Sequence, residues 1–131
     1  MIGAKMTTEQ QQATWLRELV DFALDNDVSD EIARQREIVA AQPDSSRARF
    51  DLGVLHYSQG RIYDAIGEFL MAVEIDPLYS QAYRKLGEIY VNLGDYRQAG
   101  SYALKAAELG DTSLFDAFRR YPAMRGFVEA N

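Results

Sequence analysis

The sequence has little of what most metal-binding, secreted or membrane proteins use. Its 131 residues include no cysteine and only one histidine, which excludes disulfides and thiolate metal sites. No apolar run reaches the ~18–20 residues that span a bilayer, and the first twelve residues lack the apolar core of a signal peptide. The net charge of −6 disfavours nucleic acid and anionic lipid as partners. We therefore expect a cytoplasmic protein that binds neither nucleic acid nor membranes.

Catalytic and metal-binding motifs are also missing. The sequence has no Gly-x-Ser-x-Gly elbow, phosphate-binding loop, dinucleotide fingerprint or histidine-based zinc motif. The segment Asp25–Asp30 is similar to the start of a calcium loop, but Asp30 and Arg36 stand where that loop needs glycine and glutamate. His56 lies on an apolar stripe, and no cysteine or second histidine can join it, so we assign it a packing role. These absences predict a protein that is not an enzyme and has no cofactor or metal.

What the sequence does have is an internal repeat. Aligning Ser46–Tyr79 with Ser80–Ser113, a shift of 34 residues, leaves nine identical positions without a gap. Unrelated segments of this length would share roughly two identities at ordinary residue frequencies. A period in this range indicates a solenoid, in which each unit buries its apolar face against its neighbours.

Each unit has the pattern of two antiparallel helices. Apolar residues recur at three- and four-residue steps on both sides of Gly60 and Gly94, which suit the left-handed residue that ends a helix. We expect helix hairpins at Ser46–Asp76 and Ser80–Leu109. Gly53 and Gly87 lie inside the first helices, where glycine costs about 0.5–1 kcal/mol relative to alanine. We predict that both face a neighbouring helix at close range.

These units resemble the tetratricopeptide repeat, whose pattern is W-x2-L-G-x2-Y, then A-x3-F, then P, over 34 residues. The second unit matches it through Tyr83, Leu86, Gly87, Tyr90 and Ala99, and the first through Leu52, Gly53, Ala65, Phe69 and Pro77. One period upstream, Trp15, Phe22 and Pro43 are in register, but Leu19 replaces the glycine and Glu31 the alanine. The resemblance implies an all-α fold, a right-handed superhelical stack of antiparallel helix hairpins with a C-terminal capping helix.

The resemblance also predicts the organisation of the chain. Residues 1–8 form a flexible N-terminus, and residues 9–45 a degenerate repeat with helices near Glu9–Leu24 and Asp30–Ala41, separated by a turn that Asp27–Asp30 caps. Residues 46–79 and 80–113 are the two intact repeats. Capping helices in residues 114–131 cover the last apolar face with Phe115, Phe118, Met124 and Phe127.

The function that the resemblance implies is protein–protein interaction, with a partner segment bound on the concave face that the first helices form. Helical spacing places eight candidate contact residues there: Arg47, Phe50, Val54, Tyr57, Gln81, Arg84, Glu88 and Asn92. We expect Arg84 and Asn92 to be accessible to solvent, with Tyr57 nearby.

Several alternatives stay open at this point. Phe50 and Tyr57 suit a groove and a core equally well, because aromatic side chains serve in both. Arg84 can instead pair with Glu88 as an ordinary helix-surface contact. For the whole chain, the alternative is a structural or self-associating scaffold, part of a larger protein, with no ligand in the groove.

Overall fold

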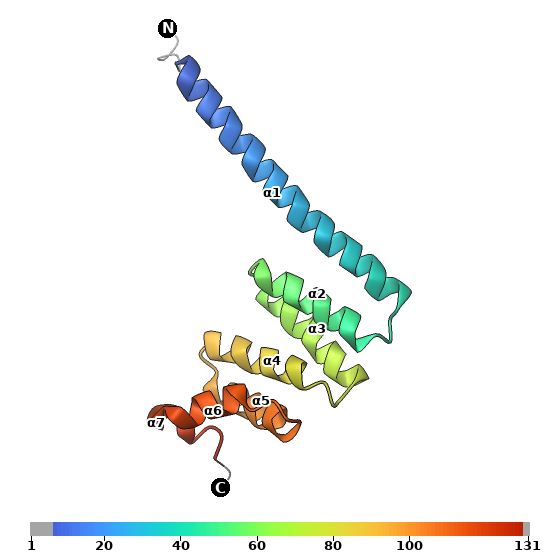
Figure 1. Cartoon of the computed structure of the whole chain (residues 1–131), viewed down its shortest axis with the longest axis vertical. Coiled ribbons are helices and arrows are strands. Elements are labelled where there is room, and N and C mark those ends of the chain that lie inside the picture. The colour runs from blue at the N-terminus through green and yellow to red at the C-terminus, as the bar shows by residue number, and fades with distance from the viewer. Residues whose placement is uncertain (1–6, 130–131) are drawn as a thin grey trace.

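The computed structural model describes residues 7–129 and, within them, only the backbone of residues 21–29. All regular structure in that part of the chain is helical: α1 (Thr8–Ala41), α2 (Ser46–Ser58), α3 (Ile62–Ile75), α4 (Ser80–Asn92), α5 (Tyr96–Glu108), α6 (Ser113–Arg120) and α7 (Pro122–Arg125). Figure 1 shows the helices following one another from the N-terminus to the C-terminus as a stack. The predicted all-α class is confirmed. None of these helices combines the length and apolar content needed to cross a bilayer.

Two helix hairpins, α2–α3 and α4–α5, form where the internal repeat predicts them. The side chains of Ser45 and Asp95 accept hydrogen bonds from backbone amides three residues on, at 3.1 and 3.2 Å, and so begin helices α2 and α5. Gly60 and Gly94 end the first helices with φ angles of 74° and 79°, in the left-handed region that favours glycine. The sequence signals for both turns therefore act as expected.

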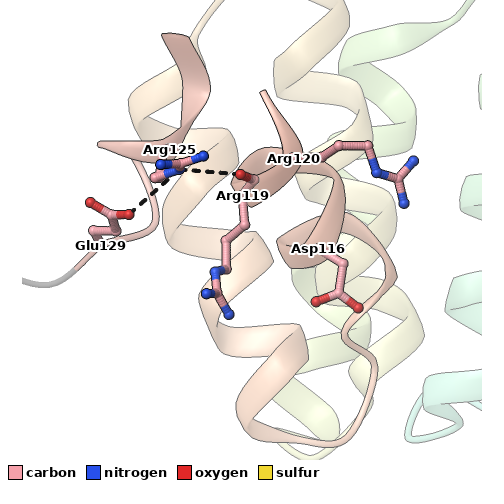
Figure 2. Close-up of a pocket in the computed structure, with 5 residues that line it drawn as sticks. All are labelled: Asp116, Arg119, Arg120, Arg125 and Glu129. Atoms are coloured by element: carbon pink, nitrogen blue, oxygen red, sulfur yellow. Dashed lines mark hydrogen bonds and ion pairs between the residues drawn. The ribbon is translucent and has the colours of Figure 1, made fainter. Parts of the chain in front are cut away.

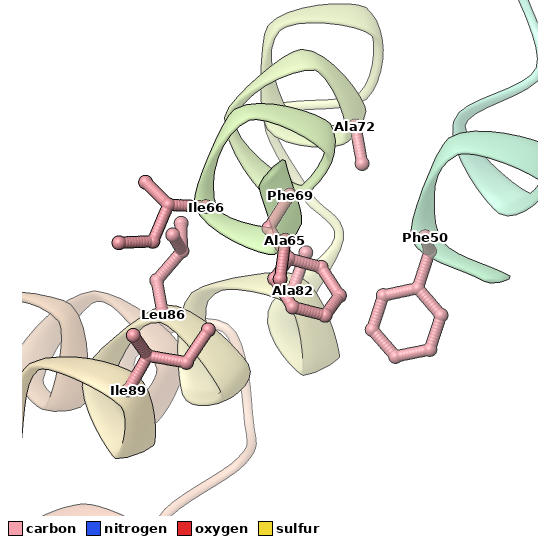
Figure 3. Packing of buried hydrophobic residues seen from close by; sticks show 8 residues of the cluster. All are labelled: Phe50, Ala65, Ile66, Phe69, Ala72, Ala82, Leu86 and Ile89. Atoms are coloured by element: carbon pink, nitrogen blue, oxygen red, sulfur yellow. The ribbon is translucent and has the colours of Figure 1, made fainter. Parts of the chain in front are cut away.

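The two hairpins pack on each other through small and apolar side chains of α3 and α4 (Figure 3). Within the first hairpin, where α2 meets α3, the structure requires glycine at position 53, because a Cβ atom built on Gly53 would lie 2.8 Å from Cε1 of Phe69, whose side chain is fully buried. At Gly87 a Cβ would lie 3.3 Å from the carbonyl oxygen of Ala99 and would meet the Leu114 side chain. Both glycines face a neighbouring helix at close range, as predicted.

The predicted hairpin in residues 9–45 is wrong. The backbone of Thr8–Ala41 forms one continuous helix, α1, through the expected turn at Asp27–Asp30. Its C-terminal half packs on α2, where Ile32 and Val39 join a cluster with Leu52, and its N-terminal half extends beyond the other helices (Figure 1). The register position of the turn glycine is occupied by Asn26, and the small residues that let two helices of a hairpin approach are replaced by Leu19 and Glu31. Most of the predicted flexible segment, residues 1–8, lies outside the described residues.

The C-terminal helices cover the end of the stack, as expected. Phe118 of α6 and Val128, which follows α7, are buried against Ala99 and Ala103 of α5, and Phe115 and Met124 pack beside them. Phe127, the fourth residue expected to cover this face, is instead 38% exposed. The last helix, α7, begins at Pro122, a residue suited to the first turn, and ends at Arg125.

Candidate functional site

The predicted contact residues all lie on α2 and α4, the first helices of the two intact hairpins. Four of them are exposed: Arg47, Val54, Gln81 and Asn92. Three are half-buried: Tyr57, Arg84 and Glu88. Phe50 is buried. We call the face that carries the seven accessible residues the α2–α4 face.

Phe50 belongs to the core rather than to this face. Its side chain is 9% exposed, and its ring lies 5.4 Å from that of Phe69 and 5.0 Å from that of Tyr79, measured between centroids. Figure 3 shows the ring directed from α2 toward α3. Aromatic pairs at this spacing contribute to packing. The sequence allowed Phe50 to lie in either a groove or the core, and the structure places it in the core.

A direct hydrogen bond joins the two intact repeats across this face. The Nδ2 group of Asn92, near the end of α4, donates to the hydroxyl oxygen of Tyr57, near the end of α2, at 2.5 Å. The structure thus places Tyr57 beside Asn92, as expected. Because each residue is at the C-terminal end of its helix, the contact fixes how far apart these ends lie.

Arg84 is held in place by two carboxylates. Its Nη1 group contacts Glu88 at 2.6 Å and its Nε group contacts Asp111 at 2.8 Å, and 25% of the side chain stays exposed. Burial opposes the charge of Asp111, but hydrogen bonds from Ser113 and Arg84 outweigh it, so the pKa of this carboxyl is lowered. The expected pairing with Glu88 is present, and Arg84 is less accessible than we predicted for a groove residue.

Asp111 is the residue of this site that sequence reasoning missed. It precedes α6 and lies 27 residues after Arg84, so no helical spacing connects the two. The nearest signal in the sequence is its place at the start of α6, where Asp111 accepts hydrogen bonds from the backbone and the hydroxyl of Ser113. This position, two residues before the first residue of α6, brings the carboxylate within 2.8 Å of the Nε group of Arg84.

A separate hollow lies between α6 and α7 (Figure 2). Its lining is strongly charged: Asp116, Arg119, Arg120, Arg125 and Glu129. The Nε group of Arg125 donates to the carbonyl oxygen of Arg119 at 3.2 Å and lies 3.8 Å from Glu129. All five residues are exposed, and two carboxylates offset two of the three arginines. The hollow is therefore an open, solvated surface of mixed charge.

His56, the single histidine of the chain, is buried. Its side chain is 3% exposed, and its Nδ1 atom has no hydrogen-bond partner among the residues that the structure describes. Burial lowers its pKa below the ordinary value of 6.5. Within the same residues, no three histidine, aspartate or glutamate side chains come together as a metal site would need. The packing role predicted for His56 agrees with its burial.

Comparisons with known proteins agree with the helical repeat. Two family models described as tetratricopeptide repeat match residues 31–80 and 68–100. Human tetratricopeptide repeat protein 6 is 34% identical over 76 residues, which are 56% of this chain and 15% of that protein. The chain therefore spans only a small part of the length of this relative.

Solved structures show the same fold at low sequence identity. The MamA protein has a TM-score of 0.67 at 20% identity, over 77% of this chain and 56% of that one. The type III secretion chaperone SycD of Yersinia enterocolitica, in complex with a peptide of the translocator YopD, has a TM-score of 0.63 at 13% identity, over 95% and 94% of the two chains. Because the two family models together cover residues 31–100, more than half of the sequence, this chain belongs to the tetratricopeptide repeat family.

Proposed function

We propose that this chain binds an extended or helical segment of a partner protein on the α2–α4 face. The observation that carries the proposal is the exposure of Arg47, Val54, Gln81 and Asn92 on the first helices of both intact repeats. The structural similarity to SycD, which was solved with a peptide of YopD, supports a peptide as the ligand.

The chemistry of the face narrows the kind of segment that it would take. Val54, which is 37% exposed, and the half-buried ring of Tyr57 provide apolar contact area. Gln81 and Asn92 provide amide groups that can fix the register of a peptide backbone. Its positive side chains are both paired: Arg47 with Asp51, and Arg84 with Glu88 and Asp111. A segment without a strong net charge therefore suits this face.

A charge placed on the α2–α4 face should weaken peptide binding. Peptides are first selected from a random library against the full chain, and their dissociation constants are measured by fluorescence polarisation. Val54→Asp is expected to weaken binding at least tenfold, or about 1.4 kcal/mol, because it introduces an uncompensated carboxylate beside Tyr57. The Arg84→Ala variant is less informative, since it would leave Glu88 and Asp111 unpaired.

The matched control is Tyr63→Asp, which introduces the same charge at an exposed position of α3. It should leave the affinity within twofold of the parent. Amide chemical shifts provide a second measurement, and selected peptides should perturb α2 and α4 more than α3 and α5. Equal loss of affinity in both variants, or perturbations confined to α3 and α5, would remove the α2–α4 face from consideration.

A further inference from the structure

The N-terminal half of α1 presents an apolar face to solvent. Trp15 is 61% exposed, and Leu16, Leu19 and Val20 are exposed beside it. Trp15 and Leu19 are four residues apart and share one side of the helix, with Leu16 and Val20 flanking them. Figure 1 shows this part of α1 extending away from the hairpins. Contiguous exposed apolar side chains of this kind are typical of interaction surfaces.

The C-terminal half of α1 also has an uncovered face. It packs on the next hairpin through Ile32 and Val39, as α3 does through the equivalent positions. However, α3 uses a second face, formed by Ala65, Phe69 and Ala72, to pack against its own first helix, and those residues are fully buried. The corresponding residues of α1, one period earlier, are Glu31, Gln35 and Ile38. Glu31 is exposed and Ile38 is 45% exposed. Gln35 between them is half-buried, and its Nε2 group donates to the carbonyl oxygen of Ala48 at 3.1 Å, so this second face is open on both sides of Gln35.

The two open faces complement each other but cannot meet within one chain. One period before α2 and α3, residues 12–24 occupy the register of a first helix and residues 28–41 that of a second helix. Because α1 is continuous, these halves lie in line, and the first cannot fold back over the second. We propose that two copies of this chain pair antiparallel along α1, with the N-terminal half of each covering the C-terminal half of the other. In this dimer each repeat hairpin is formed by the first-helix segment of one copy and the second-helix segment of the other, which is a domain swap.

Contacts in the intact repeat give the register of this pairing. Between α2 and α3, Arg49 pairs with Glu68 at 3.2 Å, and the Cα of Gly53 faces Phe69. The residues one period before Arg49 and Glu68 are Trp15 and Arg34, and those before Gly53 and Phe69 are Leu19 and Gln35. In the dimer, Trp15 of one copy therefore faces Arg34 of the second copy, and Leu19 faces Gln35 of the second copy. A guanidinium over an indole ring is a favourable contact. Because Leu19 and Glu31 replace a glycine and an alanine, the exchanged helices lie further apart than α2 and α3.

The symmetry of the pair doubles the paired surface. A two-fold axis makes each contact twice, so in the register with Leu19 opposite Gln35 the open faces of residues 13–20 and 34–41 of both copies take part. The pairing also closes on itself, because each copy has both open faces and neither is left for a third copy.

Sedimentation equilibrium of the full chain tests the proposal. The expected mass is twice the 14.8 kDa of one chain at micromolar concentration. The double variant Trp15→Gln, Leu19→Gln should raise the dissociation constant by roughly 30-fold or more, the effect of losing one aromatic hot spot. The control Tyr63→Gln, Leu78→Gln removes two exposed apolar residues of the hairpins and should leave the dimer intact. Circular dichroism checks that both variants stay helical.

Cross-linking tests the antiparallel register, which is convenient because the chain has no cysteine of its own. An equal mixture of Leu19→Cys and Gln35→Cys variants should give a cross-linked dimer with a short bismaleimide. Leu19→Cys alone should give none, since the two copies of that residue would lie roughly 24 Å apart along the paired helices, at 1.5 Å per residue.

The outcomes separate this proposal from its rivals. A single-chain mass, or a dimer that Trp15→Gln, Leu19→Gln does not weaken, would overturn it. Closure of α1 within one chain would also overturn it, and would appear as intramolecular cross-linking in a monomeric chain that carries both cysteines. The proposal does not depend on peptide binding by the α2–α4 face, because Val54→Asp should leave the dimer unchanged.

Discussion

Replacing Gly53 or Gly87 with leucine is expected to lower the free energy of unfolding by about 1–3 kcal/mol. The first added atom at Gly53 already meets the ring of Phe69 at 2.8 Å, and that ring is fully buried with no open space to enter. At Gly87 the carbonyl oxygen of Ala99 limits the space, although the end of the Leu114 side chain can move. The larger loss is therefore expected at Gly53.

Gly67 offers the matched control. It lies inside α3 and is exposed, and no described atom outside its own turn lies within 4 Å of its Cβ position. Gly67→Leu should therefore raise the free energy of unfolding by about 0.5–1 kcal/mol, because leucine is a much better helix former than glycine. Urea denaturation of the three variants measures these differences. If Gly53→Leu were as stable as Gly67→Leu, the close approach of α2 and α3 would not be what requires glycine.

The hairpins could be predicted from sequence because each local signal agrees with the others. Turn glycines, small residues at the helix contact and a repeat period of 34 residues all indicate the same two units. The structure confirms these units with boundaries that differ from the predicted ones by no more than one residue at either end. The sequence did not indicate that glycine is also required at position 100, where a Cβ atom would lie 2.8 Å from the carbonyl carbon of Phe127. The repeat pattern does not predict this contact, because Phe127 follows α7 and lies outside the repeats.

The region before the hairpins could not be predicted in the same way. Trp15 and Pro43 still match the repeat pattern. However, Leu19 and Glu31 stand where the intact repeats have the small glycine and alanine that let the two helices of a hairpin pack closely. A turn then has to compete with a continuous helix, and sequence spacing alone does not decide between them. The surroundings of Arg84 could not be predicted either, because its partner Asp111 lies 27 residues away, before α6. The burial of Phe50 also depends on a residue outside its own helix, since Tyr79, which stacks on its ring, lies just before α4.

Acid is expected to destabilise this protein through His56. The folded state lowers the pKa of His56, chiefly through burial, while Asp64 and Glu68 oppose the shift and Arg36 and Arg61 add to it. The unfolded chain therefore binds a proton first as the pH falls, so the stabilising contribution is complete above pH 6.5 and is lost below it. The loss has a maximum slope of about 1.4 kcal/mol per pH unit and ends at the pKa of the folded state.

The variant His56→Phe isolates this effect, because His56 is the single histidine of the chain. An aromatic ring is compatible with the site, since the equivalent residue of the second intact repeat is Tyr90, which stacks on Tyr102 with 5.6 Å between centroids. Phenylalanine also removes the buried Nδ1 atom of His56, whose lost hydration costs about 1–3 kcal/mol. The variant should be the more stable protein in urea denaturation at pH 7.0, and its advantage should grow at pH 5.5. A parent protein that kept its full stability at pH 5.5, or an imidazole that titrated at or above pH 6.5 by proton NMR, would show that burial does not control the charge of His56.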